Sequence, residues 1–128
     1  LYFASDVLLF VRYCRDKQKP YDDISGTPYY LAPEIIEYVL ASKHERGELL
    51  PSPSFDVWAF GVLFCYCLQG YQPFLPFGND RMELFKNITN RVYDFNKRSV
   101  SIYSAALACA IFERSPRITF EQMNYFEQ

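Results

Sequence analysis

The stretch GTPYYLAPEII at residues 26–36 leads from a turn directly into a helix. Its Gly-Thr-Pro start is a turn signal. Pro33 followed by EIIEYVLA predicts a helix with proline in its first turn, where Glu34 is favoured by the positive end of the helix dipole. Tyr29 and Tyr30 therefore lie in a short connection between the turn and the helix.

A second stretch, SFDVWAFGV at residues 54–62, opens the most apolar part of the chain. Ser54 is predicted to cap a helix that ends at Gly70. The nearly uninterrupted apolar run Val57–Leu68 is too short for a bilayer, which needs about 20 residues. A helix that is apolar all round is expected in the core. Asp56 opens this helix, so its carboxylate needs hydrogen-bond partners.

The remaining sequence predicts three shorter helices joined by loops. Residues 43–53 are charged and hold one glycine and two prolines, which indicates an exposed loop. The start signals of the three helices are Asn79 or Asp80, Ser99 or Ser101, and a capping box of Thr119 with Gln122. The predicted fold class is mainly α, and the loops are expected to carry the function.

Composition restricts the class of protein. The 128 residues are 50% hydrophobic and 19% aromatic, which predicts a compact domain rather than a disordered chain. The formal net charge of -2 gives no electrostatic reason to expect nucleic acid or an anionic membrane as a partner. The four cysteines include no Cys-x-x-Cys pair, so free thiols in the reducing cytoplasm are preferred over a metal site or a disulfide framework.

Three stretches resemble the eukaryotic protein kinase family, in the family's order. GTPYYLAPEII resembles the end of the activation segment of a serine/threonine kinase, SFDVWAFGV the start of the central helix of the large lobe, and GYQPF at residues 70–74 the loop after that helix. The resemblance implies the helical C-terminal lobe of the kinase fold, whose parent domain is α+β and whose N-lobe is absent. Residues 1–34 would be the activation segment and residues 35–128 the helical subdomain, so that 1–128 is a partial kinase domain.

The resemblance implies that the connection before the first helix binds substrate. In the family the hydroxyl at the position of Thr27 hydrogen-bonds the catalytic base, and a threonine there favours serine/threonine specificity. Tyr29, Tyr30 and Leu31 would form the wall of the pocket for the substrate residue after the phosphoacceptor. The alternative is that the two tyrosines are only core aromatics.

The resemblance also gives the activation segment a regulatory position. Asp23, three residues before Gly26, stands where many kinases carry an activating phosphothreonine. Its carboxylate would mimic the phosphate in part, with less charge and no tetrahedral oxygens. Ser25 is the nearest alternative phosphorylation site, and a solvated loop residue is the other interpretation of Asp23.

Further matched positions have structural roles in the family. Glu34 would form a buried ion pair with an arginine near the end of the domain, and Arg117 is the candidate. Arg117 comes two residues early if Ser115-Pro116 matches the family's Asp-Pro, so Arg114 is the alternative. Asp56 would accept backbone N–H bonds from a catalytic loop. The full set of structural positions is Ala32, Pro33, Glu34, Asp56, Trp58, Gly61 and Arg117.

Two finer features narrow the resemblance. A charged loop that is longer than usual separates Glu34 from Asp56, and Tyr93-x-Phe95 follows the third predicted helix. Together with APEIIE at residues 32–37, these resemble the calmodulin-dependent kinase group, which includes the phosphorylase kinase catalytic subunit. In arginine-directed kinases an acid often lies five residues after the glycine of the central-helix motif. Tyr66 stands there, which argues against a strongly arginine-directed substrate.

The sequence lacks the motifs that bind ATP and transfer phosphate. It contains no Gly-x-Gly-x-x-Gly, no Val-Ala-Ile-Lys-like and no His-Arg-Asp-like segment. If Phe3 in LYFA matches the phenylalanine of the metal-binding motif, Tyr2 replaces its aspartate and Ala4 its glycine, and a tyrosine does not hold Mg²⁺ as a carboxylate does. No catalytic or metal-binding residue is therefore assigned in this chain, and ATP and Mg²⁺ are expected only in a complete, intact parent.

Two functions remain open. The chain, which begins at Leu1 and is expected to come from a larger product, would be part of a serine/threonine kinase that is inactive alone. The alternative is a pseudokinase-like binding or scaffolding module. The expected partners are the missing N-lobe and a protein substrate or protein partner, with neither nucleic acid nor membrane.

Overall fold

The computed structural model describes residues 28–42, 44–45, 47–50, 52–76, 78, 80–95 and 100–126. Within these residues every regular element is a helix, which confirms the mainly α fold class. The elements are η1 (Pro28–Tyr30), α2 (Pro33–Leu40), α3 (Pro53–Gln69), α4 (Arg81–Thr89), α5 (Ile102–Glu113), α6 (Phe120–Met123) and η2 (Asn124–Phe126).

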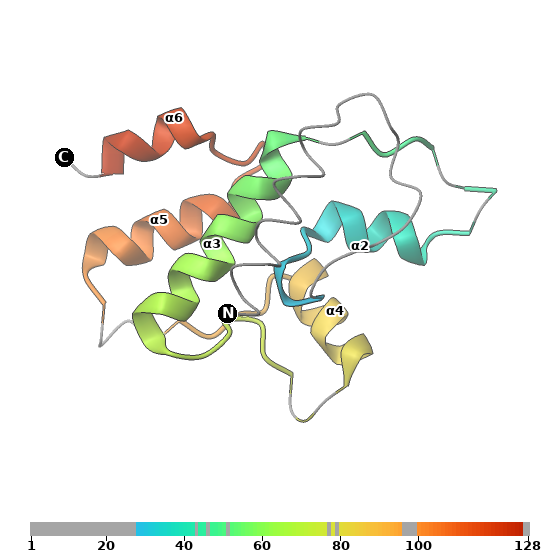
Figure 1. Cartoon of the computed structure of the whole chain (residues 1–128), viewed down its shortest axis with the longest axis horizontal. Helices are drawn as coiled ribbons and strands as arrows, with labels where there is room; N and C mark the ends of the chain where they lie inside the picture. Colours follow the sequence, from blue (N-terminus) through green and yellow to red (C-terminus); the bar gives the residue numbers. More distant parts are fainter. Residues whose placement is uncertain are drawn as a thin grey trace.

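Helix α3 is the axis of the arrangement. It runs between α5 and α6 on one side and α2 and α4 on the other (Figure 1). Contacts join α3 to α5 and to η1, while α2 packs against α4. The connection that carries Tyr29 and Tyr30 is therefore held against the middle of the molecule.

The start of α3 differs from the predicted one. The N-cap is Ser52, whose hydroxyl accepts a hydrogen bond from the Ser54 N–H at 3.2 Å, and Pro53 occupies the first helical position. The prediction of Ser54 as the cap was wrong because a proline at the first position suits the helix as well as it suits a loop. The end was predicted correctly, since Gly70 takes the left-handed conformation at φ 83°.

The other predicted start signals are confirmed where the structure describes them. The Asp80 carboxylate accepts a hydrogen bond from the Met82 N–H at 2.9 Å and begins α4. Ser101 caps α5, and Thr119 with Gln122 forms the complete capping box of α6. Pro33 begins α2 with Glu34 in its first turn.

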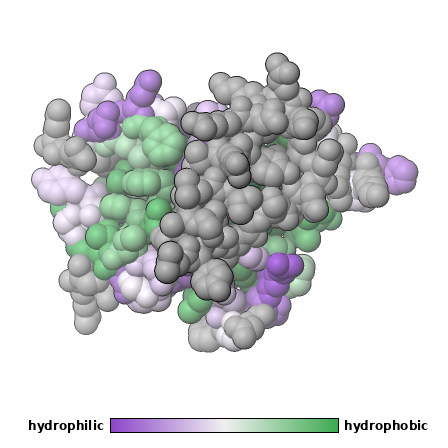
Figure 2. Space-filling view, viewed as in Figure 1, coloured by the Kyte–Doolittle hydropathy of each residue, from purple (hydrophilic) through white to green (hydrophobic). Residues whose placement is uncertain are grey.

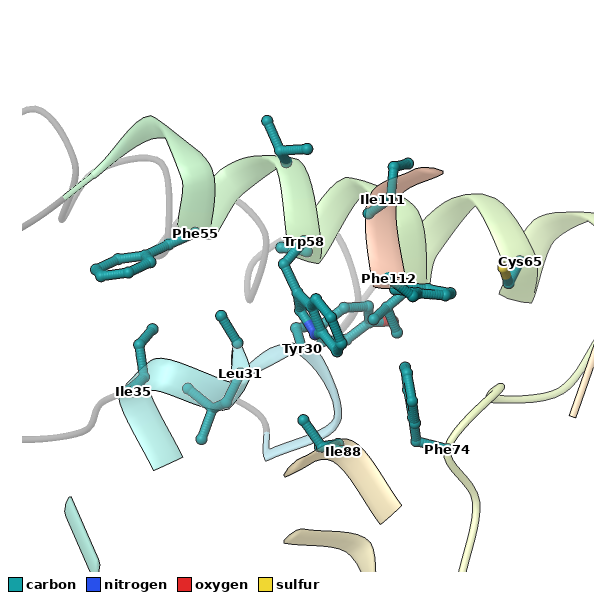
Figure 3. Close-up of a cluster of buried hydrophobic side chains, with 14 of the residues drawn as sticks. Tyr30, Leu31, Ile35, Phe55, Trp58, Cys65, Phe74, Ile88, Ile111 and Phe112 are labelled. Carbon is teal, nitrogen blue, oxygen red and sulfur yellow. The ribbon is translucent and has the colours of Figure 1, made fainter. Parts of the chain in front are cut away.

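Aromatic rings from four segments meet at the centre of the core, around Trp58 of α3 (Figure 3). The Trp58 ring centroid lies 4.8 Å from that of Phe112 on α5 and 5.4 Å from that of Phe74 in the loop after α3. Phe112 lies 5.0 Å from Phe74 and 5.1 Å from Tyr93. This cluster ties α3, α5 and the two segments that flank α4 together.

Gly61 lets α3 and α5 approach closely. A Cβ atom at this position would lie 2.6 Å from Cγ2 of Ile111 and 3.1 Å from Cε1 of Phe112. Real side chains do not tolerate a contact of 2.6 Å, so the packing role that the family resemblance gives this glycine has a physical cause here.

Helix α3 is not buried all round, although its apolar composition predicted that. Trp58, Val62 and Cys65 are buried on one side, whereas Phe60 and Leu68 on the other side are partly exposed. Hydrophobic surface over α3 and α5 is visible in Figure 2. No helix within the described ranges is long and apolar enough to cross a membrane.

Candidate functional site

A small cavity lies where the connection before α2 meets the start of α4. Its volume is about 210 Å³, and Pro28 and Tyr29 form one wall. The other lining residues are Pro76, Asp80, Arg81 and Leu84. Tyr29 is half-buried and also packs against the core. The cavity therefore combines an aromatic and proline-rich wall with one acidic and one basic side chain.

The three residues predicted for the pocket wall separate in the structure. Tyr29 lines the cavity, but Tyr30 and Leu31 are buried in the core, where they lie beneath α3 (Figure 3). The Tyr30 hydroxyl accepts a hydrogen bond from Nε2 of Gln72 at 3.3 Å, which joins the connection to the loop after α3. The alternative interpretation of core aromatics thus describes Tyr30, while Tyr29 lines the cavity.

The connection is anchored by an ion pair between residues 83 positions apart in the sequence. Nη1 and Nη2 of Arg117 donate to Oε1 and Oε2 of Glu34 at 2.9 and 3.1 Å. This is the two-point geometry in which a guanidinium matches a carboxylate. The predicted pair is present, with Arg117 rather than Arg114 as the partner.

Arg117 also fixes the beginning of α3. Its Nη1 donates to the backbone carbonyl and to the hydroxyl of Ser54 at 2.8 and 2.9 Å. Its guanidinium carbon lies 4.8 Å from the centroid of the Trp58 ring, in a cation–π contact. The Arg117 side chain is 8% exposed and that of Glu34 is 35% exposed. One cation therefore joins the start of α2, the start of α3 and the central tryptophan.

The remaining structural positions lie around this anchor. Ala32 and Pro33 are buried directly before Glu34, and Gly61 faces α5. Asp56 is half-buried in the first turn of α3. Its predicted hydrogen bonds to a catalytic loop stay a prediction.

Several predicted positions lie outside the described residues. They are the activation-segment positions Asp23, Ser25 and Gly26, the specificity residue Thr27, and the metal-motif positions Tyr2, Phe3 and Ala4.

Sequence reasoning missed the second wall of the cavity. Asp80 was interpreted only as a possible helix cap, and neither Arg81 nor Pro76 was assigned a role. No motif in the sequence marks them, because their place beside Tyr29 depends on how the loop after α3 folds back. Ser54 was likewise read as a cap, whereas its main contact is with Arg117.

A partly buried hydroxyl group belongs to Tyr93, in the segment after α4. Its hydroxyl donates to Oε1 of Glu113 at 2.7 Å and lies 3.4 Å from Sγ of Cys109. Burial, followed by these two neighbours, raises the pKa of Tyr93 above its usual value near 10. Burial also raises the pKa of Cys65 to about 12. Within the described part of the chain, no three His, Cys, Asp or Glu side chains are placed to hold a metal ion.

Comparison with known proteins adds the family to this geometry. The family model described as "Protein kinase domain" matches residues 10–125. The chain is 42% identical over 76 residues to death-associated protein kinase dapk-1 of Caenorhabditis elegans, which covers 59% of this chain and 4% of that protein. It is 38% identical over 91 residues to protein kinase C-like 1 of the same organism, covering 71% of this chain and 11% of that protein.

A mammalian relative is similar in the same way. Death-associated protein kinase 2 of Homo sapiens is 36% identical over 81 residues, which cover 63% of this chain and 19% of that protein. The chain thus spans less than a fifth of the length of these three relatives. Because the family model covers nearly all of it, the chain belongs to the protein kinase domain family and is related to serine/threonine kinases.

Proposed function

We propose that this chain is the substrate-side helical part of a serine/threonine protein kinase domain. The complete domain would transfer phosphate from ATP to serine or threonine hydroxyls of proteins. The observation that supports this most is the Glu34–Arg117 pair, which fixes the connection carrying Tyr29 beside a cavity of about 210 Å³. A protein substrate or partner and a cytoplasmic location are part of the same proposal.

The role of these residues in such a reaction is positioning. Phosphate transfer depends on alignment of the substrate hydroxyl and on charge stabilisation. Tyr29 and Pro28 would hold the substrate residue after the phosphoacceptor, while Thr27 would orient the hydroxyl toward the catalytic base. Because the connection is already fixed, it loses little conformational entropy when a substrate binds.

We propose no ATP or Mg²⁺ site within the residues of this chain. The 128 residues contain no glycine-rich phosphate motif, and the described part holds no cluster of carboxylates for a metal. We therefore derive no step of phosphate transfer from them. The substrate-side positions are what this sequence contributes.

The test uses the full gene product and peptide arrays that differ in the phosphoacceptor and in the residue after it. We expect transfer of labelled phosphate from Mg-ATP to serine and threonine peptides but not to tyrosine peptides. Tyr29→Ala should change the preference at the residue after the phosphoacceptor, because it removes one wall of the cavity. Tyr125→Ala, at a residue that is 78% exposed, is the matched control and should leave the preference unchanged.

A pseudokinase-like binding module is the second candidate, because Tyr2 and Ala4 stand where the metal-binding motif is expected. The same arrays separate the two candidates. Retention of peptides without any transfer of phosphate would favour the binding module. Phosphate transfer that ignores Tyr29→Ala would contradict the role proposed for the cavity.

A further inference from the structure

A second cavity, of about 440 Å³, lies on the other side of Pro76 from the first. Its walls are the loop after α3, one side of α4 and the segment after α4, which Figure 1 shows as neighbours. The volume falls within the range of about 300–1,000 Å³ typical of ligand pockets. The first cavity contacts Tyr29, whereas this one does not, so the two are separate sites that share one proline.

Hydrogen bonds between its walls form this cavity in advance of any ligand. The Asp94 N–H donates to the Pro73 carbonyl at 2.8 Å. Nε2 of Gln69 donates to the carbonyls of Tyr71 and Asp94 at 3.1 and 3.0 Å. The Tyr71 hydroxyl donates to Oδ2 of Asp94 at 3.3 Å. A preformed site loses little conformational entropy when a ligand binds.

The described lining of the cavity is negatively charged. Glu83 and Asp94 both line it, and no lysine or arginine is among its described lining residues. Neither carboxylate forms an ion pair with any residue that the structure describes. Arg91, the nearest arginine in sequence to Asp94, donates instead to the carbonyls of Phe112 and Thr89 at 2.9 and 3.4 Å. Among the described residues, therefore, no cation neutralises either carboxylate.

The rest of the lining is apolar and accessible. Leu75 and Val92 are 53% and 60% exposed at the cavity, and Tyr71 and Tyr93 add aromatic surface. A long side chain with an apolar stem and a cationic end matches this combination, because arginine and lysine bury their stems while the charged group meets an acid. An apolar residue beside the cation would cover Leu75 and Val92.

We propose that this cavity is a docking site for a basic segment of a protein partner, in which an arginine or lysine reaches Glu83 and Asp94 and an adjacent apolar residue covers Leu75 and Val92. The site lies apart from the cavity at Tyr29 and from the position of Tyr66. The cation would be bound by Glu83 and Asp94, and not by an acid at the position of Tyr66 in the central helix. The proposal concerns peptide binding and not phosphate transfer, so a binding measurement tests it whether or not the protein is catalytically active.

The test measures binding of fluorescein-labelled dodecapeptide pools to the full gene product by fluorescence anisotropy. Each pool fixes one residue as arginine, lysine, aspartate or leucine and omits serine, threonine and tyrosine, so that no peptide acts as a phosphoacceptor. Arginine and lysine pools should bind in preference to aspartate and leucine pools, and more weakly as salt concentration rises. The double variant Glu83→Lys with Asp94→Lys should weaken their binding about tenfold or more, because attraction becomes repulsion.

Glu48→Lys is the matched control, since Glu48 is an exposed acid in the loop before α3. It should bind the pools as the unmodified protein does. Glu83→Gln with Asp94→Asn keeps the shape of both side chains and should still lose the preference for cations if the double lysine variant does not fold. Equal binding of basic and leucine pools, or a loss with Glu48→Lys equal to that with the cavity variants, would overturn the proposal.

Discussion

At the scale of single residues, Arg117 connects more of the fold than any sequence spacing indicated. It donates two hydrogen bonds to the Glu34 carboxylate and two to Ser54, and its guanidinium lies over the Trp58 ring. The pairing with Glu34 was predictable from the family motif, although the register near Pro116 left Arg114 open. The bonds to Ser54 were not predictable, because they depend on the place where α3 begins.

Arg117→Ala should lower the free energy of unfolding by about 2–4 kcal/mol. Loss of one partner of a buried pair costs about 3–5 kcal/mol, and the 35% exposure of Glu34 reduces that. Arg114→Ala, at an exposed position, should change it by about 0.5 kcal/mol or less. Urea denaturation of the full gene product measures both. Equal losses in the two variants would show that Arg117 has no special role.

The stability of the fold should decline at alkaline pH because of Tyr93 and Cys65. Both groups ionise at higher pH when folded than when unfolded, with reference pKa values of 10.0 and 9.0. Their contribution is complete below about pH 9 and is lost as pH rises through the range up to about 12, because the unfolded chain releases its protons first.

Tyr93→Phe tests the tyrosine part of this decline. The variant should have a shallower decline of the free energy of unfolding with pH in the alkaline range. At neutral pH its free energy of unfolding should be lower by about 1 kcal/mol, because the hydrogen bonds of the hydroxyl are lost. Denaturation curves at a series of pH values give the slope. Tyr125→Phe should leave it unchanged, and an unchanged slope in Tyr93→Phe would contradict the burial argument.

At the scale of elements, the positions of the helices followed from the sequence while their exposed sides did not. Capping residues such as Asp80, Ser101 and Thr119 act within a few residues, so local patterns located them. The burial of α3 depends on which segments pack beside it. Phe60 stacks at 6.0 Å on Phe64 and remains partly exposed, which composition alone did not reveal.

Gly61→Ala should lower the free energy of unfolding by about 1–3 kcal/mol, because its Cβ would overlap Ile111. Adding Ile111→Leu removes the Cγ2 atom at 2.6 Å and should restore part of the loss. Gly47→Ala has no atom within 4 Å of its new Cβ and is the control. Thermal unfolding would detect the difference. A neutral Gly61→Ala would mean that α3 and α5 lie farther apart.

At the scale of the whole molecule, the sequence predicted the protein kinase family but not the shape of the surface. Tyr29 lines a cavity, and its role in binding substrate stays a prediction. The places of Asp80 and Arg81, and the cavity at Glu83 and Asp94, depend on how the loops beside α4 fold back. Such contacts join segments far apart in the chain and leave no local pattern. The family motifs therefore indicated the fold better than the recognition surface.

Residues 1–128 by themselves should not bind ATP. They contain no glycine-rich phosphate motif and, in the described ranges, no site for a metal. We expect no change in melting temperature with Mg-ATP, and no nucleotide retained in equilibrium dialysis. The full gene product measured in parallel is the comparison. A clear shift with residues 1–128 alone would contradict this assignment.

Hydrogen–deuterium exchange of the full gene product, with and without Arg117→Ala, tests most directly whether α3 is the axis to which Arg117 fixes the connection before α2. We expect the amides of residues 57–65 to exchange most slowly. Arg117→Ala should increase the exchange rates of residues 29–37 and 53–56 more than those of α4. Exchange of α3 as fast as that of α6 would contradict its role as the axis. Unchanged exchange of residues 29–37 after the loss of Arg117 would contradict the role of Arg117 in fixing the connection.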